Sequence, residues 1–170
     1  MSEFSRICDR RTLPAEPLVL TATPAECAAL AARFSLVAVR HLTATITLEA
    51  DGNKVLASGT IDAAIVQSCA VSGEDLPADI AAPVALRFVP ASDSPPAHEE
   101  VELSADQLDD VEMDGTQFDL GEALAQELAL AVDPYAEGPG AAAARQKAGI
   151  VNEGESGPFA GLAALKKSLE

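Results

Sequence analysis

The alternation of apolar and polar residues predicts that a β-sheet forms most of this chain. Between His41 and Ala50 every second residue is aliphatic, and most of the residues in between are threonine. A period of two with β-branched residues on the polar side is typical of a strand that packs one face against a core. Asp51-Gly52-Asn53 has the composition of a hairpin turn. Val55–Val71 predicts the returning strand, either as one long strand or as two strands that meet near Gly59.

Other segments predict shorter strands and the turns between them. The additional strands are Phe4–Arg10 at an edge, Ala82–Val89 before Pro90, and Glu99–Leu103. Thr12–Pro17 predicts a turn or an extended segment, and Ser72–Pro77 predicts a turn. Residues 91–117 are rich in Pro, Ser, Asp and Glu and predict an acidic loop, which ends in the acidic linker Leu108–Gly115.

Two stretches have the period and the start signals of helices. The first begins at Thr23-Pro24-Ala25-Glu26, which offers an N-cap and a proline at the first helical position, and extends to about Phe34. The second begins after Asp119, with Glu122 three residues later in a capping-box pattern. Asp133-Pro134 ends it.

Beyond Tyr135 the apolar period is lost. Residues 136–157 predict a flexible linker. Residues 158–170 predict a short amphipathic helix, with Phe159, Leu162 and Leu165 on one face and lysines near its carboxyl end. A helix this short is marginal in isolation, so it either docks on its own domain or binds a partner.

These elements predict one α+β domain over residues 1–135, in which an antiparallel sheet packs against two main helices. The pattern leaves open whether the sheet closes into a barrel. The length of 170 residues agrees with one domain and a tail.

Charge is distributed unevenly along the chain. Eleven basic and 27 acidic residues give a formal net charge of −16. There is no Lys or Arg from Phe88 to Ala144, but there are 14 Asp and Glu. Such a chain is a poor candidate for non-specific binding to nucleic acid and a good one for attracting basic partners.

The sequence also argues against a membrane or secreted protein. No apolar run is long enough to cross a bilayer, and the first residues lack a basic region followed by an apolar one. The three cysteines, Cys8, Cys27 and Cys69, are widely separated and odd in number, which favours a reducing compartment. We therefore expect a cytoplasmic protein.

Candidate catalytic chemistry is sparse. The histidines, His41 and His98, lie on a predicted strand and in the acidic loop, and neither is next to a candidate nucleophile in the sequence. No paired-cysteine metal motif and no phosphate-binding loop occurs. We expect no enzyme activity, metal, cofactor or small-molecule substrate. The alternative is a ligand-binding or hydrolytic site built on Cys69 and His41, which would require an exposed, acidic thiol beside a base.

Several motifs together resemble one known family. They are Phe4-Ser5-Arg6, the segment Val66–Leu76 around Cys69, Phe118–Glu122, Glu127–Tyr135, and Gly157–Lys166. In this order they are similar to the YceD-like family, the large ribosomal RNA subunit accumulation proteins, over nearly the whole chain. The resemblance implies a small cytoplasmic non-enzyme that acts in making or accumulating the RNA of the large ribosomal subunit.

The chain departs from the family pattern at its cysteines. Family members often carry a second cysteine three residues after the first and a further set after the second helix. This chain has Ser72 at the first of these places and no cysteine after Tyr135. A metal site is therefore not carried over from the resemblance.

Two kinds of partner fit the resemblance and the charge. A basic ribosomal protein would meet the acids Glu99, Glu100, Asp109 and Asp110, with Phe159, Leu162 and Leu165 as candidate apolar contacts. A precursor of the large-subunit RNA would instead meet Arg6, Arg10 and Arg11, with Arg33 and Arg40, if these cluster. A third alternative is a generic acidic interaction module without a link to ribosomes.

Overall fold

The computed structural model describes residues 3–91 and 110–150. The chain divides into two units. Unit 1 comprises residues 1–67 and 77–133, and unit 2 comprises residues 68–76 and 134–170.

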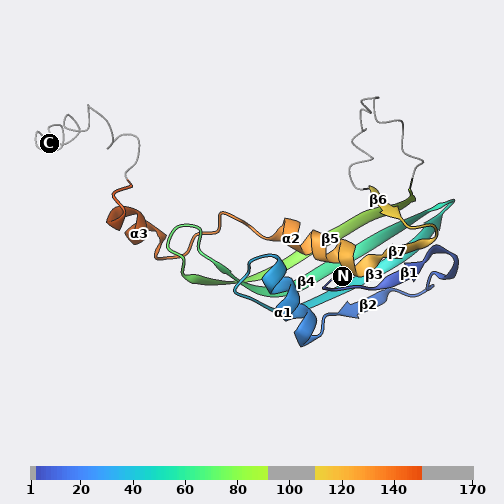
Figure 1. Cartoon of the computed structure of the whole chain (residues 1–170), viewed down its shortest axis with the longest axis horizontal. Helices are drawn as coiled ribbons and strands as arrows, with labels where there is room; N and C mark the ends of the chain where they lie inside the picture. The colour runs from blue at the N-terminus through green and yellow to red at the C-terminus, as the bar shows by residue number, and fades with distance from the viewer. Residues whose placement is uncertain (1–2, 92–109, 151–170) are drawn as a thin grey trace, which may run out of the picture. The chain divides into compact units, whose positions relative to one another are not determined.

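A twisted five-stranded sheet forms the larger part of unit 1 (Figure 1). Its strands lie in the order β2 (Leu18–Thr21), β3 (Ala38–Asp51), β4 (Lys54–Ser68), β5 (Asp75–Pro90) and β6 (Asp110–Met113). β3 and β4 form a long antiparallel hairpin, from Ala38 opposite Val66 to Asp51 opposite Lys54, with an irregularity between Val39 and His41. Gly52, which has a φ of 61°, lies in the hairpin turn and adopts the left-handed conformation that such turns require.

A second, two-stranded sheet joins the beginning of the chain to its later part. β1 (Ile7–Asp9) pairs antiparallel with β7 (Gln117–Asp119), and a short 3₁₀ helix, η1 (Arg10–Thr12), follows β1. β5 and β6 are parallel, so the larger sheet is mixed. Over the described residues the two sheets do not close into a barrel.

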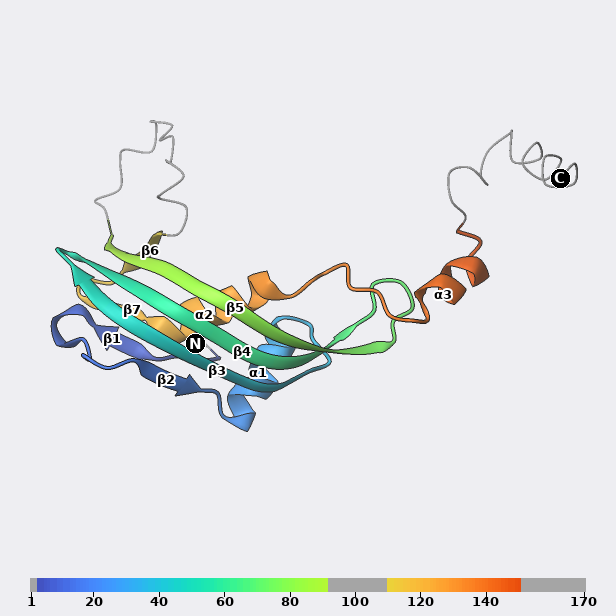
Figure 2. The same cartoon turned by 180° about the vertical axis from the view of Figure 1, so that it is seen from behind.

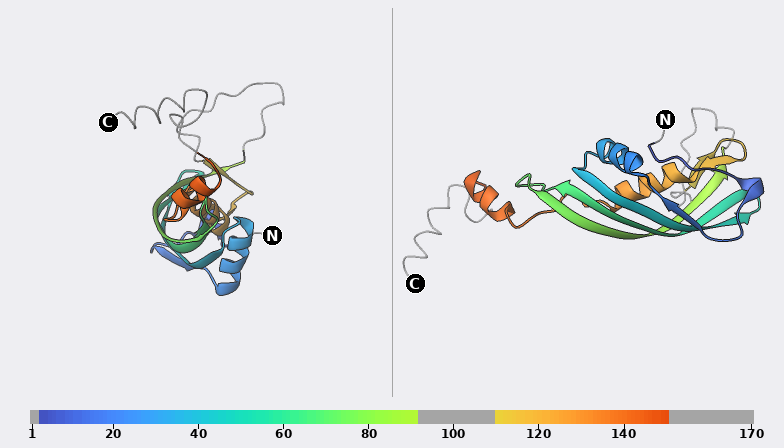
Figure 3. Two further views of the ribbon diagram at one scale, coloured as in Figure 1. Left: turned by 90° about the vertical axis from the view of Figure 1, so that its left-hand side faces the viewer. Right: turned by 90° about the horizontal axis from the view of Figure 1, so that it is seen from below.

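Two helices pack on the same face of the sheet, as the opposite views in Figures 1 and 2 show. α1 (Pro24–Arg33) presents Cys27, Leu30 and Ala31 to the core, and α2 (Leu120–Ala131) presents one buried side along most of its length. They cover the aliphatic side of β3, where Leu42, Ala44, Ile46 and Leu48 are buried. In Figure 3 the sheet curves around these helices. The opposite face carries the threonines of β3 toward solvent.

The first residues of the chain are held against the start of α2. Asp119, the N-cap of α2, accepts hydrogen bonds from Glu122 N (3.1 Å), Arg6 N (2.7 Å) and Ser5 Oγ (2.6 Å). Leu120 N donates to Arg6 O at 3.0 Å. Phe4 is fully buried. A Cβ added at Gly121 would lie 2.3 Å from Phe4 O, so only glycine allows this approach.

Unit 2 pairs the loop before β5 with the segment after Asp133. Ala70 N donates to Ala136 O (3.0 Å), and Cys69 N donates to Glu74 O (2.7 Å). Helix α3 (Ala141–Lys147) follows, and its Arg145 Nη1 donates to Glu137 Oε2 at 2.8 Å.

The structure confirms the predicted α+β class, both main helices and the β3–β4 hairpin. Thr23 and Asp119 cap α1 and α2 as predicted, and Val55–Val71 corresponds to a single strand, β4. The predicted strand at Glu99–Leu103 lies outside the described residues.

Other predictions about elements were wrong. The predicted Ser72–Pro77 turn is displaced, because β5 already begins at Asp75. Pro77 is tolerated in the strand because β6 pairs with β5 only at Arg87–Pro90, which leaves that edge of β5 without a ladder near Pro77. The predicted antiparallel sheet is present, with one parallel pair added where β6 joins β5.

Three short strands and one helix were not predicted. β2 was missed, and β6 and β7 lie in or beside the stretch predicted as an acidic linker. These strands have three or four residues each, too few for a period to be recognised. The range predicted as a flexible linker contains α3, whose alanines have high helix propensity.

No helix in the described part of the chain is long and apolar enough to cross a membrane.

The contact at Gly121 predicts that an alanine there destabilises the protein, whereas helix propensity alone predicts that it stabilises it. Propensity alone predicts that Gly121→Ala stabilises α2 by up to about 1 kcal/mol. We expect a loss of about 1–3 kcal/mol in the free energy of unfolding, because the methyl group would collide with Phe4 O. Urea denaturation measures it. Gln126→Ala, at an exposed position of the same helix, is the control and should change stability by less than about 0.5 kcal/mol. A stabilised Gly121→Ala variant would contradict the packing of residues 4–6 on α2.

Candidate partner-binding surfaces

Arg6 does not extend freely into solvent. Its guanidinium donates to both oxygens of Glu26 in α1 (2.7 and 3.1 Å) and to Thr21 O at the end of β2 (3.3 Å). The bonds from Arg6 to Glu26, with a further one from Thr23 N, lower the pKa of Glu26 to about 2. Arg6 thus ties the N-terminal segment to the first turn of α1.

Arg10, Arg11 and Arg33 are also engaged, each at a different place. Arg11 Nη2 donates to Asp9 Oδ2 at 2.6 Å, and Arg10 Nη1 donates to Gly52 O in the β3–β4 turn at 3.1 Å. Arg33, at the end of α1, donates to Glu122 (2.6 and 2.8 Å) and Glu3 (2.8 Å). Arg6, Arg11 and Arg33 are therefore paired with carboxylates, whereas Arg10 binds a backbone carbonyl. Arg40 is exposed on β3 beside His41.

Of the predicted acidic contacts, the structure places Asp110. It begins β6 and forms a short ion pair with Arg87 of the neighbouring strand β5. Glu99, Glu100 and Asp109, and the apolar contacts Phe159, Leu162 and Leu165, lie outside the described residues, so they stay predictions.

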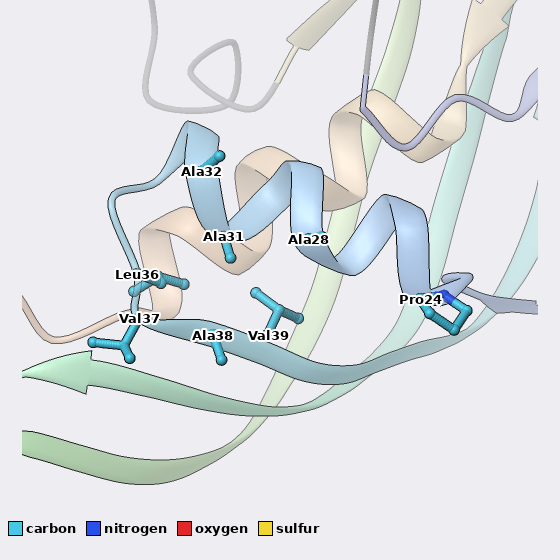
Figure 4. A pocket seen from close by; sticks show the side chains of 8 residues that line it. All are labelled: Pro24, Ala28, Ala31, Ala32, Leu36, Val37, Ala38 and Val39. Atoms are coloured by element: carbon cyan, nitrogen blue, oxygen red, sulfur yellow. The ribbon is translucent and has the colours of Figure 1, made fainter.

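The structure shows two hollows that sequence patterns did not reveal. The larger, of about 440 Å³, lies between α1 and the start of β3 (Figure 4). Small and aliphatic side chains line it: Pro24, Ala28, Ala31, Ala32, Leu36, Val37, Ala38 and Val39. It has no charged or polar side chain in its lining, so its polar surface comes from the backbone.

The smaller hollow, of about 180 Å³, lies between α2 and strands β5 and β6, and we call it the α2 groove. Its lining residues are Leu86, Asp110, Val111, Ala123, Gln126, Glu127 and Leu130. It therefore combines an apolar floor with carboxylate and amide oxygens. Leu130 is 80% exposed, which is unusual for a leucine in a helix that is otherwise packed on a core.

Cys69 is the thiol of the alternative hypothesis, a ligand-binding or hydrolytic site. It lies in unit 2, and its sulfur accepts hydrogen bonds. Ser72 N and Gly138 N each donate to Sγ at 3.3 Å. These bonds lower the pKa of Cys69 to about 6, Gly138 contributing most. Burial has the opposite effect on Cys8 and Cys27 and raises their pKa values.

An acidic thiol is not sufficient for catalysis at this place. Cys69 is only 4% exposed, and the contacts found at its sulfur are backbone N–H groups and Ser72 rather than a base. His41 is exposed on β3. Within the described residues, no three His, Cys, Asp or Glu side chains are arranged to hold a metal ion. The geometry favours surfaces for binding over a reaction centre.

Comparison with known families identifies the chain. The model of the family described as large ribosomal RNA subunit accumulation protein YceD matches residues 57–166. The chain belongs to the YceD family. No curated protein and no solved structure matches it. The resemblance inferred from the sequence is confirmed, and the family name gives this YceD protein a role in the accumulation of large-subunit ribosomal RNA.

The family match includes one of the hollows described above and excludes the other. The α2 groove and the Cys69 loop lie within residues 57–166, whereas every lining residue of the α1–β3 hollow precedes them. The features within the match are the better candidates for whatever the family has in common.

The hydrogen bonds to Cys69 make the stability of unit 2 depend on pH. The pKa of the folded thiol, about 6, lies below its ordinary value near 9. The stabilisation is therefore complete above about pH 9 and is lost as the pH falls through about 6. We expect amide exchange at Ser72 and Gly138, corrected for the intrinsic rate, to become less protected between pH 7 and about 5.

Cys69→Ser is the control for this titration. It should remove the pH dependence and the ultraviolet thiolate signal that appears near pH 6, since Cys8 and Cys27 titrate higher. A thiolate signal that first appears above pH 8 in the wild-type protein would contradict the proposed hydrogen bonding.

Proposed function

We propose that this YceD protein promotes the accumulation of large-subunit ribosomal RNA in the cytoplasm by binding a basic ribosomal protein, without catalysing a reaction. The proposal combines the family role with the charge of the chain. A protein of net charge −16 attracts cationic partners over a Debye length and slows non-specific contact with phosphate. A ribosomal protein held in this way would be kept available for assembly.

The observation that carries the proposal is the distribution of charge around the arginines. Arg6, Arg11 and Arg33 are paired with carboxylates. These cations are already neutralised by the chain itself, while the stretch from Phe88 to Ala144 has acids without any Lys or Arg. The field at the surface is therefore negative.

The aromatic residues also favour a protein partner over RNA. Single-stranded RNA is commonly bound by stacking bases on exposed aromatic rings next to basic side chains. Here Phe4, Phe88 and Phe118 are buried, and Phe88 packs on Phe118 with ring centroids 4.3 Å apart. Tyr135 is exposed but lies outside the sheet, and no Phe, Tyr or Trp is exposed on the described strands.

Affinity capture from lysate, with protein and RNA both identified, tests this function. We expect a basic large-subunit protein to co-purify at about 0.1 M salt and to be largely lost at about 1 M, where the Debye length falls to about 3 Å. Ribonuclease treatment should not release it.

The double variant Arg10→Ala/Arg11→Ala distinguishes the two partner classes. If the protein binds a ribosomal protein through its acids, this variant should support normal large-subunit RNA levels in cells that lack the wild-type chain. Loss of RNA binding and of RNA accumulation in this variant would instead support direct contact with the precursor RNA. Absence of all ribosomal components at both salt concentrations would refute the proposed function.

A further inference from the structure

The exposed side of helix α1 has the composition of a buried surface. The exposed residues of α1 before Arg33 are Pro24, Ala25, Ala28 and Ala32. The opposite side of the helix is buried on the core. Glu26, the single acid of α1, is already bound by Arg6. A helix that is apolar on all sides is normally covered on all sides, whereas the described residues leave the alanine side of α1 exposed.

This alanine side continues into the α1–β3 hollow. Ala28 and Ala32 line the hollow from α1, and Val37 lines it from the segment just before β3 (Figure 4). Val37 is 48% exposed. At about 440 Å³, the hollow is larger than a cavity of roughly 150 Å³ that binds benzene, so it has room for more than one aliphatic side chain. An exposed aliphatic side chain and an apolar hollow therefore lie next to each other on one surface.

Few charges surround the hollow, although the chain as a whole is acidic. From Pro17 to Leu48 the sequence has one acid, Glu26, and two arginines, Arg33 and Arg40. Glu26 and Arg33 are held in ion pairs. The lining residues, all within the described part of the chain, offer neither a cation to RNA nor an acid to a basic protein. The surface that fits the hollow is therefore apolar and uncharged.

A second copy of the chain offers such a surface. A symmetric dimer brings the same patch of both copies together, so the patch must be complementary to itself in shape and in charge. The exposed Val37 of each copy can fill the hollow of the other, and the small alanines allow two α1 helices to approach closely. Two copies of net charge −16 repel each other, and this repulsion is weakest where both surfaces are uncharged.

We propose that this protein forms a symmetric dimer, in which α1 packs against α1 of a second copy and Val37 of each copy enters the α1–β3 hollow of the other. Burial of the alanine side and of Val37 stabilises the dimer. The inference goes beyond the proposed function and does not depend on it. Because every lining residue of the hollow precedes the family match, the inference concerns this chain rather than the family as a whole.

Sedimentation velocity of the full chain over a concentration series tests the dimer. We expect a species with twice the mass of one chain. Its dissociation constant should fall as the salt concentration rises from about 0.1 M to about 1 M, because salt screens the repulsion between two anionic copies. This dependence is opposite to the release by salt that we expect for a basic ribosomal protein. A chain that stays monomeric at both salt concentrations, or a dimer that salt dissociates, overturns the inference.

Substitutions at Ala28, near the middle of the exposed side of α1, test the proposed contact. Ala28→Glu and Ala28→Lys each place like charges opposite one another in the dimer and should weaken it by about tenfold or more. An equimolar mixture of the two variants should recover a heterodimer, because opposite charges then meet. Val19→Asp, at an exposed aliphatic position of the edge strand β2, is the matched control and should change the dissociation constant by less than about twofold. Both positions are exposed, so the variants should fold, and circular dichroism checks this.

The outcomes separate the dimer from the proposed function. The α1 contact is overturned if Ala28→Glu dimerises as the wild type does, or if the mixture of the two variants stays monomeric. It is also overturned if Val19→Asp dissociates the dimer and the Ala28 variants do not. A wild-type chain that captures a basic ribosomal protein but stays monomeric would support the proposed function and refute the dimer. A dimer that captures no ribosomal component would do the reverse.

Discussion

The attachment of residues 4–6 to the first turn of α2 is the interaction on which the rest of unit 1 depends. Asp119 caps α2 and, with the same carboxylate, binds Ser5 and the backbone of Arg6. A helix begins with N–H groups that have no partner inside the helix, and here a side chain satisfies one of them while it also holds a distant segment. The absence of a side chain at Gly121 lets the backbone of Phe4 approach, and Phe4 then fills the core.

The same attachment brings charged side chains of distant segments together in ion pairs. Once residues 4–6 are in place, Arg6 reaches Glu26 of α1, and Arg33 of α1 joins Glu3 to Glu122 of α2. These partly exposed pairs contribute little to stability individually. They also neutralise the charge of arginines that the sequence offered as RNA contacts. Each pair also neutralises an acid, so the formal net charge of the chain stays at −16.

A role by binding agrees with this architecture. The core is formed by the aliphatic face of the sheet and the two helices, so the described polar groups serve as caps, pairs and surface. The thiol with the lowest pKa, Cys69, is used by its own loop as a hydrogen-bond acceptor. The α2 groove differs from the rest because there an apolar floor, an acidic rim and an exposed leucine occur together.

The sequence by itself determined the elements whose signals are local. The alternation in β3, the turn at Gly52 and the caps Thr23 and Asp119 depend on residues two or three positions apart, and the structure has them where they were predicted. The tertiary structure alone decided the rest. β2, β6 and β7 are strands because neighbouring edges supply their hydrogen-bond partners, and the parallel pairing of β6 follows from where the chain returns. The backbone N–H of Arg6 donates to Asp119, which lies 113 residues later in the sequence. Arg33 donates to Glu122, 89 residues later. No local pattern encodes such contacts, because they arise only when the fold brings distant segments together.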